Sequence, residues 1–286
     1  MNSPFIQSID GVRFRLREPY DFGFIGRYGL VFRVFDDQDS GNICFGTERD
    51  DERFFIKFAG APTIRSTVSA ETAISNLKGT VPLYRDLKHN SLIKLIDAVQ
   101  IGGGFAMIFR WEDAICMGRQ YPDQHALFMS LPKSAKLRIF DDITDFIKHT
   151  AAMGYVAVDF YDGSIMYDPI AERTVICDID FFRKQPCVND MGRMWGSSLF
   201  QSPEEYELGS VIDEITNVYT LGAAAFALFA NYERTRESWR LGDATFSVAA
   251  KAVENDRSKR YSSITEFADA WTIALESERK GSTKND

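Results

Sequence analysis

Several aspartates in the second half of the sequence lie where a carboxylate is costly to bury. In the stretch GYVAVDFYDGSIMYD, Asp159, Asp162 and Asp168 stand among apolar and aromatic neighbours. Farther along, Asp178 and Asp180 interrupt the apolar run TVICDIDFF. An isolated carboxylate is expensive to desolvate, so such residues are expected to be paired or to bind a metal ion. We therefore expect metal and phosphate chemistry in this part of the chain.

The elements that must position these aspartates change in character along the chain. Short runs rich in Val, Ile and Phe, typical of β-strands, fill the first third: VRFRL, LVFRVFD, RFFIKFAG and GFAMIFRW. Between the last two, STVSAETAISNLKG predicts one helix that ends at Gly79. Beyond residue 125 the patterns are helical: KSAKLRIFDDITDFIKHTAAMG, DEITNVYTLGAAAFALFANY and SSITEFADAWTIALESE. The order predicts a β-rich front with one helix, a bridge near residues 110–114 and a helical back.

Composition and charge exclude several classes of protein. Apolar content of 45% and charged content of 26% are those of an ordinary soluble globular protein. The net charge of −8 argues against nucleic acid or an anionic membrane as the main partner. The four cysteines form no C-x-x-C pair, which favours free thiols in a reducing cytosol over disulfides or a zinc site. The first residues lack the apolar core of a signal peptide, and the longest apolar run, LGAAAFALFA, is too short to span a bilayer. We expect a cytoplasmic monomer.

The segment around the first aspartates resembles the catalytic segment of the protein kinase-like superfamily. In that family the loop reads H-R-D-x-x-x-x-N and is followed by two strands and D-F-G. Here Ala157, Val158 and Asp159 match H-R-D, and Ser164 matches the Asn. Asp178 matches the Asp of D-F-G. The resemblance implies that Asp159 orients the acceptor hydroxyl and that Asp178, with Ser164, binds Mg²⁺ at the phosphates of ATP.

Two further aspartates are candidate metal ligands. Read from Asp180, the letters DFF mimic D-F-G directly, and Asp180 is an alternative to Asp178. Asp178 is preferred because the apolar run TVIC precedes it as a strand would. The DIDFF pattern also resembles the D-F-D/E pattern of small-molecule kinases in the same superfamily. Asp162 is expected to assist Ser164, which is a poorer magnesium ligand than Asn.

Downstream motifs extend the resemblance. GSSLFQSPEE is similar to the family segment G-T-x-x-Y-x-x-P-E that closes the activation loop, and TNVYTLGAAAFAL resembles the helix that begins D-V-Y-S-L-G. DRSKRYSSITEF is similar to the element P-x-x-R-x-S. The resemblance implies a buried bidentate ion pair between Arg260 and Glu204. It also implies that Asn217, which stands where the family has Asp, hydrogen-bonds the catalytic loop.

Upstream motifs resemble the nucleotide-binding half of the family. FGFIGRYGLVFRVFD looks like the glycine-rich phosphate loop, with Gly26 and Gly29. Lys57 in FFIKF matches the strand lysine that binds the α- and β-phosphates, and Glu71 is the candidate for its helix partner. Its apolar neighbours favour a partnered Lys57 over a surface lysine on an edge strand. The segment before the bridge is also expected to contact the nucleotide, through Phe109, Arg110 and Trp111.

The resemblance covers about residues 20–270 and implies a bilobal α+β fold. Residues 1–110 would form a β-rich, nucleotide-binding N-lobe with one main helix. Residues 111–286 would form a mostly helical C-lobe with the catalytic loop, the metal-binding Asp and the activation segment. The implied activity is Mg²⁺-dependent transfer of the γ-phosphate of ATP to a hydroxyl, as in divergent, bacterial-type Ser/Thr protein kinases. The P-E segment favours a protein acceptor.

Departures from the family pattern leave two alternatives open. Tyr161 stands where protein kinases place a lysine that steadies the γ-phosphate, and Val158 replaces the Arg that pairs with a phosphorylated activation loop. A small-molecule kinase of the aminoglycoside or choline type is the first alternative, with DIDFF and Tyr161 in its favour. A pseudokinase that binds nucleotide or a partner without turnover is the second, favoured by Ser164, Tyr161 and the imperfect glycine loop.

Overall fold

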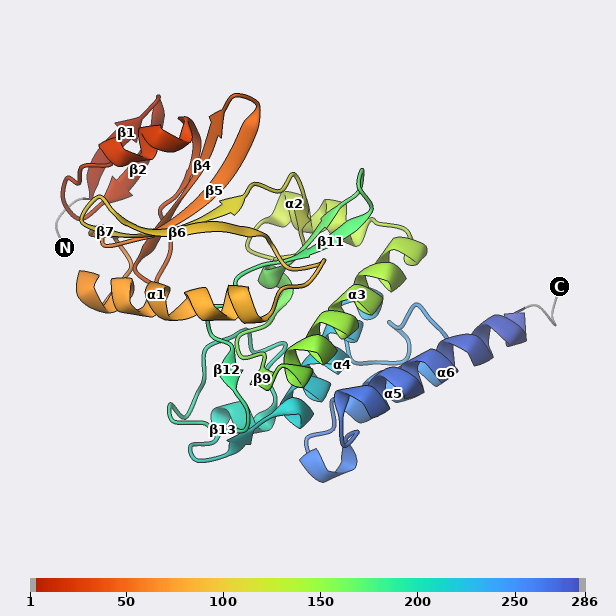
Figure 1. Cartoon of the computed structure of the whole chain (residues 1–286). Helices are drawn as coiled ribbons and strands as arrows, with labels where there is room; N and C mark the ends of the chain where they lie inside the picture. Colours follow the sequence, from red (N-terminus) through yellow and green to blue (C-terminus); the bar gives the residue numbers. More distant parts are fainter. Residues whose placement is uncertain (1–3, 283–286) are drawn as a thin grey trace. The chain divides into compact units, whose positions relative to one another are not determined.

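The computed structural model describes residues 4–282, which belong to two compact units (Figure 1). The first unit comprises Met1–Asp86 with Ile93–Glu112, and the second comprises Leu87–Leu92 with Asp113–Asp286. The first unit holds a five-stranded antiparallel sheet, and most of the long helices lie in the second. The predicted mixed α+β class is therefore confirmed. Within residues 4–282, no helix has the length and apolar character needed to cross a membrane.

The sheet of the first unit has the strand order β3-β4-β5-β7-β6. Its strands are β3 (Leu30–Phe35), β4 (Asn42–Arg49), β5 (Glu52–Ala59), β6 (Leu95–Ile101) and β7 (Gly104–Arg110). A separate hairpin, β1 (Phe5–Ile9) with β2 (Val12–Leu16), and the 3₁₀ helix η1 (Gly23–Tyr28) precede it. Apolar residues that alternate along β4 and β5 form one core with this hairpin and η1, among them Ile43, Phe45, Ile56 and Phe58. The predicted strand runs in this region are confirmed.

The helix α1 (Ala70–Asp86) packs against this sheet and is longer than the sequence predicts (Figure 1). The expected end at Gly79 is wrong, because α1 continues through it for another two turns. Tertiary contacts outweigh the low helix propensity of glycine here. The Thr80 hydroxyl contacts Sδ of Met107 at 3.2 Å, and the Tyr84 ring lies 5.0 Å from that of Phe109.

Within the described residues the second unit is built from five helices, and the predicted helical patterns correspond to the longest three of them. They are α2 (Pro122–Met129), α3 (Lys133–Ala152), α4 (Glu214–Ala230), α5 (Asp243–Ala252) and α6 (Ile264–Ser282). From Thr216 to its end, α4 is buried throughout, because its apolar residues lie on all sides of the helix. Aromatic rings join α3, α4 and α6 in one core. The centroids of Phe140 and Trp271, for example, are 4.6 Å apart.

Short strands in the second unit position the predicted catalytic residues. They are β8 (Ile115–Cys116), β9 (Tyr155–Val156), β10 (Ile165–Asp168), β11 (Arg173–Ile176), β12 (Arg183–Lys184), β13 (Cys187–Val188) and β14 (Val211–Ile212). The loop after β9 carries Asp159, and the 3₁₀ helix η2 (Asp162–Ser164) leads into β10. The antiparallel pair β10–β11 then ends just before Asp178. Two loops of the same unit thus carry the predicted acids.

Candidate functional site

The loop that carries Asp159 is fixed by Asn217 of α4, as predicted. The Ala157 N–H donates to Asn217 Oδ1 at 2.8 Å, and Asn217 Nδ2 donates to the Ala157 carbonyl at 2.8 Å. Asn217 is fully buried, so this two-way contact is shielded from water. It ties the backbone two residues before Asp159 to the core of the unit.

Asp159 and Asp178 both have left-handed backbone conformations, with φ of 60° and 56°. Aspartate tolerates this region better than most residues, yet it remains uncommon away from tight turns. Such strain persists only where the surrounding structure enforces it, and it gathers at functional sites. Asp180 is not among the positive-φ residues of the described chain. The backbone therefore favours Asp178 over Asp180 as the specially positioned acid.

Tyr161 shows that the predicted acids gather in one neighbourhood. Burial raises the pKa of its hydroxyl well above the ordinary value, and nearby negative groups raise it further. These groups are, in order of effect, Asp178, Asp159, Cys177 and Asp162. An acid on a remote face of the unit would not affect this hydroxyl, because Coulomb interactions weaken with distance and screening. Three of the predicted acids, Asp159, Asp162 and Asp178, thus lie near the same buried hydroxyl.

Ser164 and Asp162 differ in how well they suit a metal ion. Ser164 is fully buried, and its Oγ finds no hydrogen-bond partner within residues 4–282. A buried hydroxyl without a partner is unusual and fits a place for a ligand atom. Asp162 is also buried, but its Oδ2 accepts a hydrogen bond of 2.7 Å from the Tyr232 hydroxyl. Burial and this bond raise the pKa of Tyr232, so Tyr232 remains a donor to Asp162.

The residues present fit Mg²⁺ held together with a phosphate ligand, but not a metal caged by protein alone. Within the described residues, no three His, Cys, Asp or Glu side chains converge as a metal site. Magnesium is usually bound through one or two carboxylates plus substrate phosphates. Asp178 is exposed, and the buried hydroxyl of Ser164 has no hydrogen-bond partner among residues 4–282. These two residues are the best-placed ligands, whereas Asp162 already serves Tyr232.

The predicted ion pair between Glu204 and Arg260 is confirmed. Arg260 Nη1 lies 2.7 Å from Glu204 Oε1, and Nη2 lies 2.9 Å from Oε2, with both residues buried. Arg257, which sequence reasoning missed, also contacts Glu204 at 3.2 Å and pairs with Asp213. The Thr216 hydroxyl donates to Glu204 as well. The carboxylate is therefore almost fully satisfied, and it fixes α4 to the segment that ends in Pro203 and Glu204.

In the first unit, Lys57 lies on β5. In chain order β5 is the third strand of the five-stranded sheet, and α1 is the next element after it. It stands opposite Met107 in the register of β5 and β7. Residues directly opposite each other on antiparallel strands point to the same face. Met107 contacts Thr80 of α1, so Lys57 also lies on the face that α1 covers. Lys57 is partly buried, and its strand is an interior one, which excludes the edge-strand alternative.

Glu71 does not occupy the place predicted for the helix partner of Lys57. It is exposed in the first turn of α1, and its pKa is lowered by its own backbone N–H and by the Ser69 hydroxyl. On a helix, Glu71 is rotated by about 200° from Ala73, which belongs to the buried face. The carboxylate therefore caps the helix and points away from the sheet.

Gly26 and Gly29 do not form a glycine-rich loop between two strands. Gly26 lies within η1, which Ile25 anchors in the core, and Gly29 ends it with φ of 108°. A side chain at Gly29 would place its Cβ 2.0 Å from the carbonyl oxygen of Glu48 in β4. Gly29 is thus required by the close approach of two backbones. The assignment of Gly26 and Gly29 to a nucleotide-binding loop is therefore wrong.

The loop that does join the first two strands of the sheet, residues 36–41, is acidic. Its sequence is DDQDSG, and two arginines hold it from outside. Arg15 pairs with Asp36 at 3.0 Å, and Arg65 pairs with Asp37 at 2.6 Å. A loop with this charge is poorly suited to surround a triphosphate unless cations neutralise it.

The segment Phe109–Trp111 packs within the first unit. Phe109 is buried against Tyr84. The backbone N–H groups of Arg110 and Trp111 donate to the carbonyls of Lys94 and Arg53. A nucleotide contact through these three residues stays a prediction. Their backbone bonds and the packing of Phe109 and Trp111 belong to the sheet, whereas Arg110 is exposed.

One aspartate of the opening stretch is structural, and one partner of the site could not have been found from the sequence. Asp168 Oδ1 accepts the N–H groups of Ile170 and Ala171 and so closes the turn between β10 and β11. Tyr232, the donor to Asp162, lies seventy residues away along the chain and belongs to no motif.

A comparison of the sequence with known protein families and with curated proteins finds no match.

Proposed function

We propose that this protein is an ATP- and Mg²⁺-dependent phosphotransferase of the protein kinase-like superfamily, with a bilobal fold. The observation that carries the proposal is the pair Asp159 and Asp178, which both have left-handed backbones and both raise the pKa of the buried Tyr161 hydroxyl. Asn217 adds support, because it fixes the loop of Asp159 as the resemblance implies. The buried pair of Glu204 and Arg260 is a third, independent feature of that resemblance.

The two acids with left-handed backbones have separate roles in this proposal. Asp159 orients the acceptor hydroxyl and accepts its proton as the phosphoryl group is transferred. Asp178, together with Ser164, holds Mg²⁺. When bound, the ion neutralises the phosphates of ATP. Tyr161 stays protonated because its pKa is raised, so it can donate a hydrogen bond but adds no charge among the acids.

Lys57 would bind the α- and β-phosphates of ATP. The support is its place on the third strand of the sheet, directly before α1, which is where protein kinases carry this lysine. The segment that ends in Pro203 and Glu204 favours a hydroxyl on a protein as the acceptor, and a small-molecule acceptor is the alternative.

Binding of Mg·ATP tests this proposal and the choice between the paired aspartates. Asp178→Asn should lose Mg²⁺-dependent ATP binding in calorimetry, and Lys57→Met should weaken it. Asp180→Asn is the matched control, with the same chemical change two residues away, and should bind normally. If only Asp180→Asn loses binding, Asp180 and not Asp178 is the metal ligand. Normal binding in all three variants would overturn the proposal.

A second candidate, a pseudokinase, is favoured by the surface around Lys57. Phe55 lies two residues before Lys57, on the same face of β5. Its ring lies 5.9 Å from that of Phe35 and 6.4 Å from that of Trp111, which also contacts Phe32. An aromatic cluster beside the lysine and an acidic first loop together favour binding without turnover. Mg·ATP binding by a wild-type protein that transfers no phosphate would select this candidate.

A further inference from the structure

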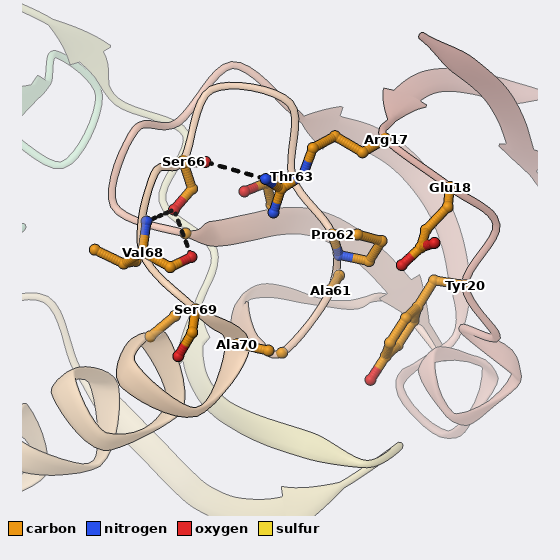
Figure 2. Close-up of a pocket in the computed structure, with 13 residues that line it drawn as sticks. Arg17, Glu18, Tyr20, Ala61, Pro62, Thr63, Ser66, Val68, Ser69 and Ala70 are labelled. Atoms are coloured by element: carbon orange, nitrogen blue, oxygen red, sulfur yellow. Dashed lines mark hydrogen bonds between the residues drawn. The ribbon is translucent and has the colours of Figure 1, made fainter. Parts of the chain in front are cut away.

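A pocket of about 200 Å³ lies in the first unit at the N-terminal end of α1 (Figure 2). Its walls come from the end of the β1–β2 hairpin, the turn after β5 and the segment that enters α1. Its polar lining includes Arg17, Thr63, Ser66 and Ser69. The volume is below that of sites for drug-sized ligands, so the pocket suits a small group and not a whole nucleotide. Among the described residues that line it, neither Lys57 nor any predicted catalytic acid appears.

The N-terminal end of α1 forms one wall of the pocket and contributes backbone N–H groups, although the Glu71 carboxylate that caps this end offsets part of its positive charge. Ser69 and Ala70 line it, and α1 extends for 17 residues behind them. Ser69 caps this end, because its Oγ accepts the N–H of Thr72 at 3.1 Å. The aligned peptide dipoles of a helix leave partial positive charge at its first turn, which attracts anions.

Arg17 adds a full positive charge to the pocket. Its backbone N–H donates to the Pro62 carbonyl at 2.9 Å, and its Nη1 donates to the Ser66 carbonyl at 3.4 Å. Figure 2 shows the side chain of Arg17 extended toward Thr63 and Ser66. A guanidinium has five N–H donors in a fork that matches an oxyanion, and the contact with Ser66 uses only one of them.

The hydroxyl of Thr63 is the second, independent indication of a ligand. Thr63 is 1% exposed, and within residues 4–282 its Oγ1 finds no hydrogen-bond partner. It lines the same pocket as Arg17 and the start of α1. Leaving a buried hydroxyl unsatisfied costs free energy, whereas an oxyanion held by Arg17 would give it an acceptor.

We propose that this pocket binds a phosphate group, either free or carried on a side chain. Its donors are the guanidinium of Arg17, the hydroxyl of Thr63 and the N-terminal end of α1. One opposing charge, Glu18, also lines the pocket, and it is exposed. The negative charge of Glu18 lowers the affinity for an anion. Removing it should therefore tighten anion binding, whereas removing Arg17 should weaken it. The proposal does not depend on phosphotransferase activity.

Binding of inorganic phosphate to the nucleotide-free full chain tests the proposal, measured by calorimetry at constant ionic strength. Arg17→Ala should weaken binding tenfold or more, because the phosphate loses a charged hydrogen-bond donor. Thr63→Val keeps the shape and removes only the hydroxyl, and it should weaken binding by about tenfold without lowering stability. Glu18→Gln should tighten binding. Arg13→Ala, on an exposed position of β2 outside the pocket, is the matched control and should bind phosphate as the wild type does.

The same titrations identify the source of the phosphate group and separate this site from the nucleotide site. Phosphoserine that binds more tightly than inorganic phosphate indicates a phosphorylated side chain, and the reverse order indicates the free anion. Lys57→Met should leave phosphate binding unchanged even where it weakens ATP binding. Equal effects of Arg17→Ala and Arg13→Ala, unchanged binding in Thr63→Val, or loss of phosphate binding in Lys57→Met would each overturn the proposal.

Discussion

Removing Arg260 should destabilise the protein strongly, because it leaves a buried carboxylate with too few partners. The side chain of Arg260 has no exposed surface, and it makes two charged hydrogen bonds to Glu204, whose side chain is only 9% exposed. Breaking a buried pair by removing one partner costs about 3–5 kcal/mol. Glu204 keeps its contacts with Arg257 and Thr216, so we expect Arg260→Ala to lose about 3 kcal/mol, the lower end of that range.

Urea unfolding at pH 7 measures this loss, and Arg257→Ala is the matched control. Arg257 is 29% exposed and lies 3.2 Å from Glu204, so its loss should cost less than that of Arg260. Burial raises the pKa of Glu204, but the hydrogen bond from Arg260 and further bonds lower it overall. The pair's stabilisation is therefore present above pH 4.5 and is lost as the pH falls below it. Arg260→Ala as stable as the wild type, or less damaging than Arg257→Ala, would refute this reasoning.

Two further predictions concern Glu205 and Asn217. Burial raises the pKa of Glu205 to about 7, so the protonated carboxyl stabilises the fold fully below pH 4.5, and this stabilisation is lost as the pH rises to 7. Glu205→Gln should remove this decline, which is on the order of 3 kcal/mol, from the stabilities measured by thermal unfolding at pH 5 and pH 8. An unchanged decline would contradict the assignment. Asn217→Ala should cost about 2–4 kcal/mol in urea unfolding, because the N–H and carbonyl of Ala157 lose their buried partner. Asn217→Asp keeps an acceptor for that N–H and should cost less. Equal costs for the two variants would count against the two-way contact.

The sequence predicts best those features that local pattern determines. Runs rich in Val, Ile and Phe identify β3, β5 and β7, and helical periodicity identifies α3, α4 and α6. The pairing of Glu204 with Arg260 is also predictable, although 56 residues separate them, because both belong to motifs of fixed order. Asn217 is found in the same way.

The failures share one physical cause, which is that a distant segment decides the role of the residue. Gly29 is needed because the backbone of Glu48 passes close to it, and the sequence around Gly29 contains no sign of this. The helix continues beyond Gly79 because the sheet supports Thr80 and Tyr84. Glu71 faces away from the sheet because the starting point of α1 fixes its rotation.

Transfer of labelled phosphate from γ-labelled ATP, with and without Mg²⁺, tests the central claim most directly. The protein itself and generic protein and small-molecule hydroxyl acceptors should be included. The proposal predicts Mg²⁺-dependent transfer by the wild type and a loss of about a hundredfold or more in Asp159→Asn, with Mg·ATP binding retained. Asp168→Asn, which changes an aspartate of the same stretch that only closes a turn, should remain active. A wild type that binds Mg·ATP without transfer, or an Asp159→Asn variant as active as the wild type, would contradict the claim.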